Sequence, residues 1–374
     1  MNIFHHDQNK LKKFMPHIAV AFIAFVLLTF GICCLFFRPS DRSIETLSDT
    51  VSSSDPDNSM ENYLAVNQEI TSYLRISTLE PESVYDSQPL KNTYDNLCIP
   101  TYLNKIGDLY FLVDCYHDQI IYHDNLSDPL TEWNVMTDQI HYGHTLASDG
   151  LVYLADDTEN NRVLVFEEKD GAFVHTQTFS DIGNRPQYII YHEATDTFYV
   201  WSSMNGEMYL FRHNPGDSRM YLTEIRCVKS LSDTYVRSFT IMDNDIYFVS
   251  GYSYILRADL STFEILETYP VPESISGMVQ LTKIQDYFYI TVSTDAFGNQ
   301  AYSTILRTRD LSGLIDGEYE DIYEYFNNIP GGGTPYYITS LDGAFYMTEH
   351  QPVNHSLWRF QVEDNEIVQV EYLY

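Results

Sequence analysis

The chain has 374 residues, 44% of them hydrophobic, which is enough to bury a substantial core and argues against global disorder. Its 53 acidic residues outnumber its 21 basic ones, and such a surface repels phosphate backbones, so nucleic acid is not expected as a partner. Tyrosine occurs 31 times, and this side chain suits the half-buried faces of β-strands.

The N-terminal segment predicts a membrane anchor. Residues 18–37, IAVAFIAFVLLTFGICCLFF, carry no charge and are long enough to span a hydrocarbon core of about 30 Å. Three lysines precede this run, which places residues 1–13 in the cytoplasm and the rest of the chain outside. A cleaved signal peptide is the alternative, but FFRPSDRS offers no A-x-A cleavage site. We therefore expect a transmembrane helix within residues 14–37 and a single-pass protein of the cell membrane whose C-terminal domain is extracytoplasmic.

The next two segments differ in composition. Residues 38–60 are rich in Ser and Asp and are expected to form a disordered linker, because they have little apolar surface to bury. Residues 61–100 fit either helical or alternating periodicity, and they are expected to form an extension that packs on, or closes, the domain that follows. Three cysteines follow the anchor, an odd number that excludes a full disulfide framework, and a bond between Cys98 and Cys115 is left open.

A repeat runs from residue 101 to residue 374. A turn followed by an apolar run containing tyrosine recurs at intervals of roughly 40–60 residues, and each copy has three further apolar runs. The tyrosines in phase are Tyr110, Tyr153, Tyr199, Tyr247, Tyr289 and Tyr346. Repeats of about this length are typical of four-stranded propeller blades, so the sequence predicts an all-β fold with a six-bladed β-propeller. A β-sandwich is the alternative, but it does not need six matched repeats.

One blade carries a family signature. The stretch from Asp156 to Phe166, DDTENNRVLVF, has an acid, a short turn, Asn, Arg and an alternating strand. It resembles the NHL repeat, although the other blades carry only degenerate versions. The resemblance implies a six-bladed propeller, and proteins of this kind include scaffolds, ligand sensors, adhesins, lactonases and amidating lyases. It therefore indicates the fold more than the activity.

Repeat phase also predicts where a site would lie. In a propeller the innermost strand starts, and the second strand ends, on the face that holds the mouth of the central channel. The ligand-binding set expected there is His144, Arg185, Tyr235, Arg237, Tyr336, Tyr337 and His350. Other residues in the same phase are also expected near the mouth: Asp114, Tyr116, His117, His141, Tyr142, Asp156, Gln187, Ser202, Ser203, Ser250, Tyr252, Ser276, Ser293, Asp295 and Glu349.

The residue types at this mouth suggest what it would bind. Arg185 and Arg237 suit a carboxylate or phosphate, and Tyr235, Tyr336 and Tyr337 suit a flat platform for sugars. The alternative is that the arginines pair with local acids and the tyrosines pack between blades.

These observations favour a binding module at the cell surface for a glycan, a peptide or a protein, with no catalytic residue and no cofactor assigned. The alternative is a metal-dependent lactonase or lyase with its site at the channel mouth. Asp114, Asp156 and Glu349 end second strands and leave open a divalent cation such as calcium, although Asp156 is better placed to cap its own turn. No phosphate-binding loop, G-x-S-x-G or H-E-x-x-H motif is present.

Overall fold

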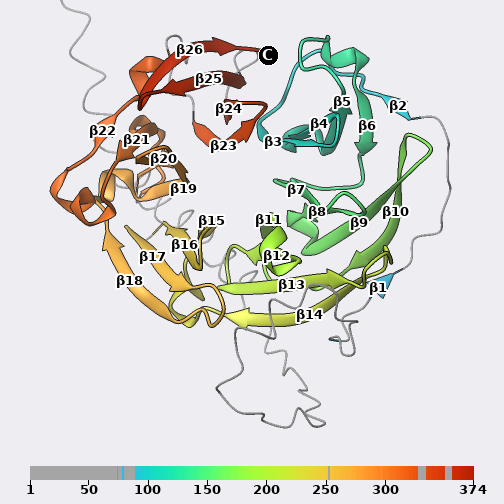
Figure 1. Cartoon of the computed structure of the whole chain (residues 1–374), viewed down its shortest axis with the longest axis horizontal. Helices are drawn as coiled ribbons and strands as arrows, with labels where there is room; N and C mark the ends of the chain where they lie inside the picture. Colours follow the sequence, from blue (N-terminus) through green and yellow to red (C-terminus); the bar gives the residue numbers. More distant parts are fainter. Residues whose placement is uncertain are drawn as a thin grey trace, which may run out of the picture. The chain divides into compact units, whose positions relative to one another are not determined.

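The computed structural model describes residue 74, residues 78–79 and residues 89–374 except 252, 296, 327–333 and 350–355. These residues form six antiparallel sheets that follow one another around a central axis (Figure 1). The innermost strand of each sheet lies beside the innermost strand of the next, and β23 and β3 complete the circle. The six-bladed propeller predicted from the tyrosine period is confirmed.

Four strands build each of the first three blades, and they are numbered outward from the axis. Blade 1 holds β3 (Pro100–Ile106), β4 (Leu109–Asp114), β5 (Gln119–His123) and β6 (Asn134–Thr137). Blade 2 holds β7 (Leu146–Ser148), β8 (Tyr153–Asp157), β9 (Arg162–Lys169) and β10 (Ala172–Phe179). Blade 3 holds β11 (Pro186–His192), β12 (Thr197–Ser202), β13 (Glu207–His213) and β14 (Met220–Cys227).

The last three blades repeat this plan. Blade 4 holds β15 (Val236–Met242), β16 (Asp245–Ser250), β17 (Tyr254–Asp259) and β18 (Ile265–Pro270). Blade 5 holds β19 (Gly277–Ile284), β20 (Tyr287–Thr294), β21 (Thr304–Thr308) and β22 (Glu320–Asp321). Blade 6 holds β23 (Pro335–Leu341), β24 (Ala344–Glu349), β25 (Leu357–Glu363) and β26 (Glu366–Tyr372). All six in-phase tyrosines lie in second strands, which explains the period.

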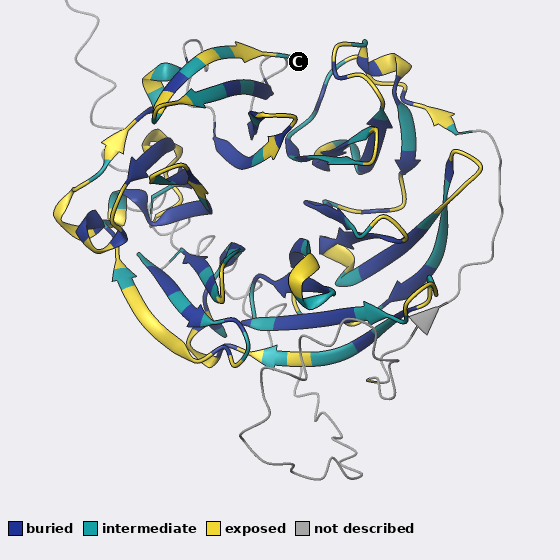
Figure 2. Cartoon of the chain, in the orientation of Figure 1, coloured by how far each residue is buried: buried dark blue, intermediate teal, exposed yellow. Residues whose placement is uncertain are grey.

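The core lies between neighbouring blades rather than at one centre. A second strand is covered on both faces by the adjacent sheets, and every residue of β8 and of β12 is buried (Figure 2). Between blades 2 and 3, for example, Leu154, Ile189 and Val200 belong to one apolar cluster. The outermost strand β18 is mostly exposed, because no sheet covers its outer edge. Each blade therefore depends on two neighbours for burial.

Hydrogen bonds tie every pair of neighbouring blades near the axis. They run from Thr101 Oγ1 to His144 O (2.8 Å), from Ile189 N to Thr145 Oγ1 (2.8 Å), from Trp201 Nε1 to Val236 O (3.0 Å), from Ser238 Oγ to Val279 O (2.6 Å), from Gln280 Nε2 to Ile338 O (3.1 Å) and from Thr348 Oγ1 to Thr101 O (2.7 Å). The last of these joins blade 6 to blade 1. Because all four strands of blade 6 come from the C-terminal end of the chain, the ring closes by packing and not by a shared strand.

The described part of the N-terminal extension adds strands to the outer edges of two blades. The strand β1 (Thr78–Leu79) pairs with β10 of blade 2, and β2 (Leu90–Lys91) pairs with β6 of blade 1. The side chain of Asn92 anchors the second strand by donating to Leu130 O at 3.0 Å. Cys98, Cys115 and Cys227 are free thiols, so Cys98 and Cys115 form no disulfide.

The predicted tail (1–13), transmembrane helix (14–37) and linker (38–60) lie outside the described residues. Among the residues that the structure describes, no helix has both the length and the apolar composition that a membrane crossing requires.

Candidate functional site

A cavity of about 180 Å³ opens at the channel mouth. All six blades contribute to its lining, which consists of Cys115, Tyr116, Tyr142, His144, Arg185, Tyr235, Arg237, Ser293 and Tyr336. These residues lie at or near the start of an innermost strand, as Arg185 does, or the end of a second strand, as Ser293 does. The face predicted from repeat phase is therefore where the structure places a cavity.

The structure brings together His144, Arg185, Tyr235, Arg237 and Tyr336 from the predicted set. Tyr337 lies beneath the cavity, buried, and its hydroxyl donates to Arg237 O at 3.2 Å. His350 lies outside the described residues. Of the lining residues, only Cys115 had no signal in the sequence, because a buried thiol just past a strand looks like ordinary core. That these residues bind a ligand stays a prediction.

The tyrosines do not form the flat platform that was expected. The rings of Tyr336 and Tyr337 meet at 60° with centroids 4.4 Å apart. Tyr337 also packs against Tyr188 at 5.0 Å and Tyr102 at 6.0 Å. Because these rings come from innermost strands of blades 6, 3 and 1, they pack together in the channel near the axis.

Two lining residues are held in an uncommon backbone conformation. Tyr142 and Arg185 precede the innermost strands of blades 2 and 3, with φ of 53° and 62°, a left-handed region that bulky residues seldom adopt. The preceding blade fixes each of them: Tyr142 N donates to Asp118 Oδ1 (3.0 Å), and Arg185 N donates to Asn161 Oδ1 (2.7 Å). The same turn thus aims a large side chain at the mouth from two successive blades.

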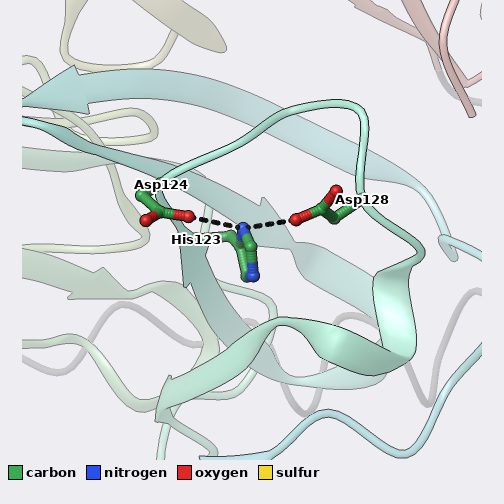
Figure 3. A group of neighbouring side chains, drawn as sticks. All are labelled: His123, Asp124 and Asp128. Atoms are coloured by element: carbon green, nitrogen blue, oxygen red, sulfur yellow. Dashed lines mark ion pairs between the residues drawn. The ribbon is translucent and has the colours of Figure 1, made fainter.

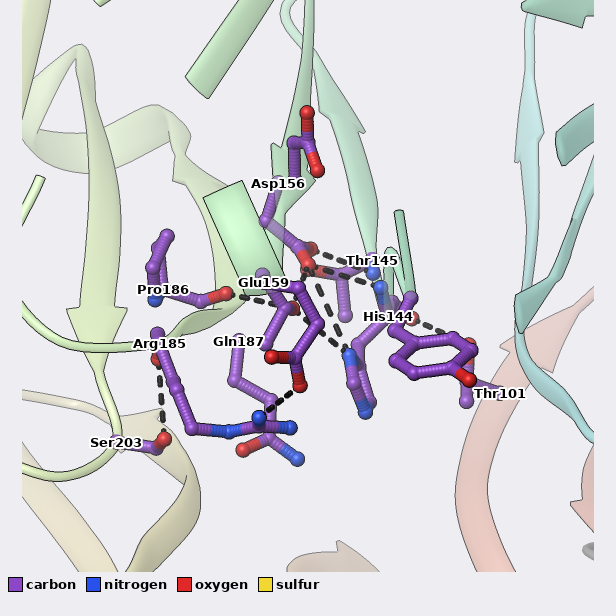
Figure 4. A network of polar contacts seen from close by, with 12 residues as sticks. Thr101, His144, Thr145, Asp156, Glu159, Arg185, Pro186, Gln187 and Ser203 are labelled. Atoms are coloured by element: carbon purple, nitrogen blue, oxygen red, sulfur yellow. Dashed lines mark hydrogen bonds and ion pairs between the residues drawn. The ribbon is translucent and has the colours of Figure 1, made fainter. Parts of the chain in front are cut away.

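The two arginines have different partners. Arg185 forms an ion pair with Glu159, so it is held by a local acid, as the alternative hypothesis expected (Figure 4). Arg237 lies with its guanidinium carbon 4.6 Å from the ring centre of Tyr235 and donates to Met278 O at 3.3 Å. Among the residues that the structure describes, no carboxylate pairs with Arg237. Arg237 is therefore the cation that the mouth leaves available for an anion.

A buried acid supports the wall of the cavity. Asp156 is fully buried and accepts hydrogen bonds from His144 N (2.9 Å), Thr145 N (2.7 Å) and Thr145 Oγ1 (2.7 Å), which Figure 4 shows. It also accepts one from Thr158 Oγ1 (2.8 Å). Burial raises the pKa of Asp156 to about 6, against the opposing effect of these hydrogen bonds. Its oxygens are engaged within blade 2, chiefly by His144 and Thr145 at the start of the innermost strand. From the described turn residues that follow β8, only the Thr158 hydroxyl donates to Asp156, so its main role is not the turn cap expected from the sequence.

His144 contributes a neutral ring to the cavity. Its Nδ1 lies 2.9 Å from Thr158 Oγ1, which in turn contacts Asp156. Burial, together with the positive charges of Arg185 and Arg237, lowers the pKa of His144 to about 3. At neutral pH the imidazole is therefore uncharged and adds no positive charge to the mouth.

Asp114 and Glu349, the other two acids considered as ligands of a cation, are bound by neighbouring residues of their own blades. Asp114 accepts from Cys98 N at 2.7 Å and lies 2.6 Å from His117 Nδ1, and Glu349 accepts from Trp358 Nε1 at 2.9 Å. Within the described part of the chain, the candidate group of metal ligands is His123, Asp124 and Asp128, on a loop of blade 1 (Figure 3). His123 is the last residue of β5, and Asp124 and Asp128 follow it, whereas Gln119 at the other end of β5 is the residue nearer the mouth. In addition, His123 Nδ1 already accepts from Asn125 N at 3.0 Å. No acid cluster of the kind the lactonase alternative requires converges on the cavity among the described residues.

Comparison with known proteins supports the fold. No family model matches the chain, and no curated protein matches its sequence. A candidate 6-phosphogluconolactonase from Bacteroides fragilis is similar over 73% of this chain and 83% of its own, with a TM-score of 0.52 and 10% identity. A candidate 6-phosphogluconolactonase from Bacteroides uniformis matches over 71% and 83%, with a TM-score of 0.51 and 10% identity. A streptogramin B lyase matches over 77% and 87%, with a TM-score of 0.50 and 17% identity.

At such identities the likeness concerns the fold and not the activity. The fold and the mouth together define the chain as a six-bladed β-propeller with four-stranded blades and a cavity at the mouth of its channel.

Proposed function

We propose that this propeller binds a small anionic ligand, or the anionic end of a glycan or peptide, in the cavity at its channel mouth. The observation that carries the proposal is Arg237, which lines the cavity without a carboxylate partner among the described residues in a protein with 53 acids and 21 basic residues. A guanidinium that has no carboxylate partner in so acidic a protein is suited to recognition of a carboxylate or phosphate.

Titration calorimetry on the full chain tests this proposal with two probes, benzoate and phenyl phosphate. The wild-type protein should bind at least one of them, and Arg237→Ala should lose that binding. If the wild type binds neither anion, or if Arg237→Ala binds as well as the wild type, the proposed function is wrong.

We also propose that residues 14–37 anchor the chain in the cell membrane with the propeller outside, as a member of the NHL-like propellers. The uncharged run and the lysines before it support the anchor, and the Asp157–Arg162 turn of blade 2 supports the kinship. Protease added to intact cells should remove the propeller and leave a small cell-bound fragment. Recovery of a mature protein that begins near residue 40 would show a cleaved signal peptide instead.

A second candidate function is a lactonase- or lyase-type reaction at the same mouth. It is favoured by the His144 ring, which lines the cavity and is supported by Thr158 and Asp156. Proton release from a δ-lactone, measured with and without added Ca²⁺, tests it against the binding module. Turnover that is lost in His144→Gln would establish the enzyme, whereas a rate equal to the blank would leave the binding module.

A further inference from the structure

We infer that the channel mouth selects a monocarboxylate carried on a single flat ring and discriminates against a dianion such as a phosphate monoester. This inference rests on the proposed function, since it specifies the ligand of the same cavity. It follows from the charges that face the cavity and from the cavity's size.

The charges around the cavity leave one unmatched positive group. Glu159 neutralises Arg185, and both side chains are about one-third exposed, at 34% and 32%. His144 is neutral, because burial and the two arginines disfavour its protonation. Arg237 remains as the one guanidinium without an acid partner in the described part of the mouth.

A single negative charge on the ligand matches this arrangement. A dianion would leave its second charge without a cation, because Arg185, which lines the cavity, is already paired with Glu159. That second charge would also lie close to the carboxylate of Glu159. Like charges that meet in a partly desolvated site repel each other strongly, and this repulsion is a common source of selectivity. Glu159 therefore acts as a specificity residue that neutralises Arg185 and repels a second negative charge close to that arginine.

The dimensions limit the ligand to one ring. The cavity measures about 180 Å³, whereas a cavity of about 150 Å³ in another protein holds one benzene molecule. Its wall includes Tyr235 and Tyr336, and its rim is formed by Tyr116 and Tyr142, whose rings lie 4.8 Å apart. Tyrosine rings accept another flat ring by offset or edge contact. A volume close to that of a one-ring cavity therefore favours one ring over two fused rings.

Benzoate, phenyl phosphate and 2-naphthoate form a matched probe set, because the first two share one ring and differ in charge, and the third adds a ring. At pH 8, where phenyl phosphate is a dianion, the full wild-type chain should bind benzoate at least tenfold more tightly than phenyl phosphate and at least tenfold more tightly than 2-naphthoate. Glu159→Gln frees Arg185 and removes the repelling charge, so it should shift the ratio of the benzoate and phenyl phosphate dissociation constants at least tenfold toward phenyl phosphate. Glu193→Gln, an exposed acid on the turn between β11 and β12, is the control and should leave that ratio unchanged.

Several results would overturn the inference. If the wild type binds phenyl phosphate or 2-naphthoate as tightly as benzoate, the inferred selectivity is wrong. The proposed function, anion binding at the mouth, would still hold in that case. An unchanged ratio in a folded Glu159→Gln variant would remove Glu159 from the explanation and overturn the mechanism. If neither one-ring anion binds, the inference fails together with the proposed function.

Discussion

The guanidinium of Arg237 stacks on the ring of Tyr235, 4.6 Å from its centre, and both residues face the same cavity. Such a contact stabilises a partly exposed cation by roughly 0.5–1 kcal/mol and fixes its position without neutralising its charge. Arg237 is thus held in place and remains able to bind an anion.

Arg237→Ala should weaken benzoate binding by about 2 kcal/mol or more, close to thirtyfold, because a charge-assisted hydrogen bond is lost. The free energy of unfolding should fall by no more than about 1 kcal/mol, since the arginine has no buried acid to leave unpaired. Calorimetric titration and thermal melting on the same variant measure both quantities. Arg309→Ala is the control, because Arg309 lies over Tyr287 in the same way at 4.7 Å but does not line the cavity. A large loss of stability with unchanged binding would make Arg237 a structural residue.

The ion pair between Asp149 and His213 joins blades 2 and 3, and its side chains are only 6% and 10% exposed. The hydrogen bond to Asp149 raises the pKa of His213. Burial disfavours ionisation of Asp149, but hydrogen bonds from His213 and from the amides of Val152 and Leu151 outweigh it and lower the pKa of Asp149. The pair therefore stabilises the fold fully between about pH 4 and 6.5, and less as pH rises through the folded pKa of His213 or falls through that of Asp149.

Asp149→Asn should accordingly cost about 3 kcal/mol near pH 5.5, because a nearly buried imidazolium loses its partner. The difference from wild type should shrink toward pH 9, and urea unfolding at several pH values measures it. Asp342→Asn is the control, since Asp342 pairs with Lys105 across blades 6 and 1 at an exposed site and should have a much smaller effect. A cost that does not depend on pH would contradict this account.

Glu349 is a buried acid whose ionised form is disfavoured by its surroundings. Its Oε1 has no hydrogen-bond partner, and burial raises its pKa to about 7, against a hydrogen bond from Trp358. A group with a raised folded pKa contributes most at low pH, so the wild-type stability should fall as pH rises from about 4.5 to 7. Glu349→Gln keeps an acceptor for Trp358 and removes the charge, and it should be more stable than wild type at pH 8 by roughly 1–3 kcal/mol. Denaturant unfolding at pH 5 and pH 8 tests this, with the exposed Glu168→Gln as control. If Glu349→Gln lowers the free energy of unfolding equally at pH 5 and pH 8, this account is wrong.

Ring closure depends on blade 6, since Thr348 Oγ1 donates to Thr101 O at 2.7 Å where the last blade meets the first. Deleting residues 336–374 should abolish cooperative folding of the whole ring, because blades 5 and 1 would each lose a covering sheet. Thr348→Val, which removes only the hydroxyl, should cost about 1 kcal/mol. Thermal unfolding followed by near-ultraviolet circular dichroism separates the two cases. A soluble truncated chain with one sharp transition would contradict six interdependent blades.

The number of blades and the face that holds the cavity were determined by the sequence alone. Tyr110 and its five counterparts recur because each second strand packs between neighbouring sheets, and each blade has one such strand. The same repeat phase placed His144, Arg185 and Arg237 at one mouth, because every innermost strand starts on the same face.

Only the tertiary structure decided which of these residues have partners. Glu159 reaches Arg185 from the preceding blade, whereas no described acid reaches Arg237, and in a chain with 53 acids no spacing rule could have distinguished the two arginines. Tyr336 faces the cavity while Tyr337, one residue later, fills the channel below it, because successive side chains of a strand point to opposite sides. Pairing across blades depends on distances between segments that are far apart in sequence, and those distances exist only once the ring has closed.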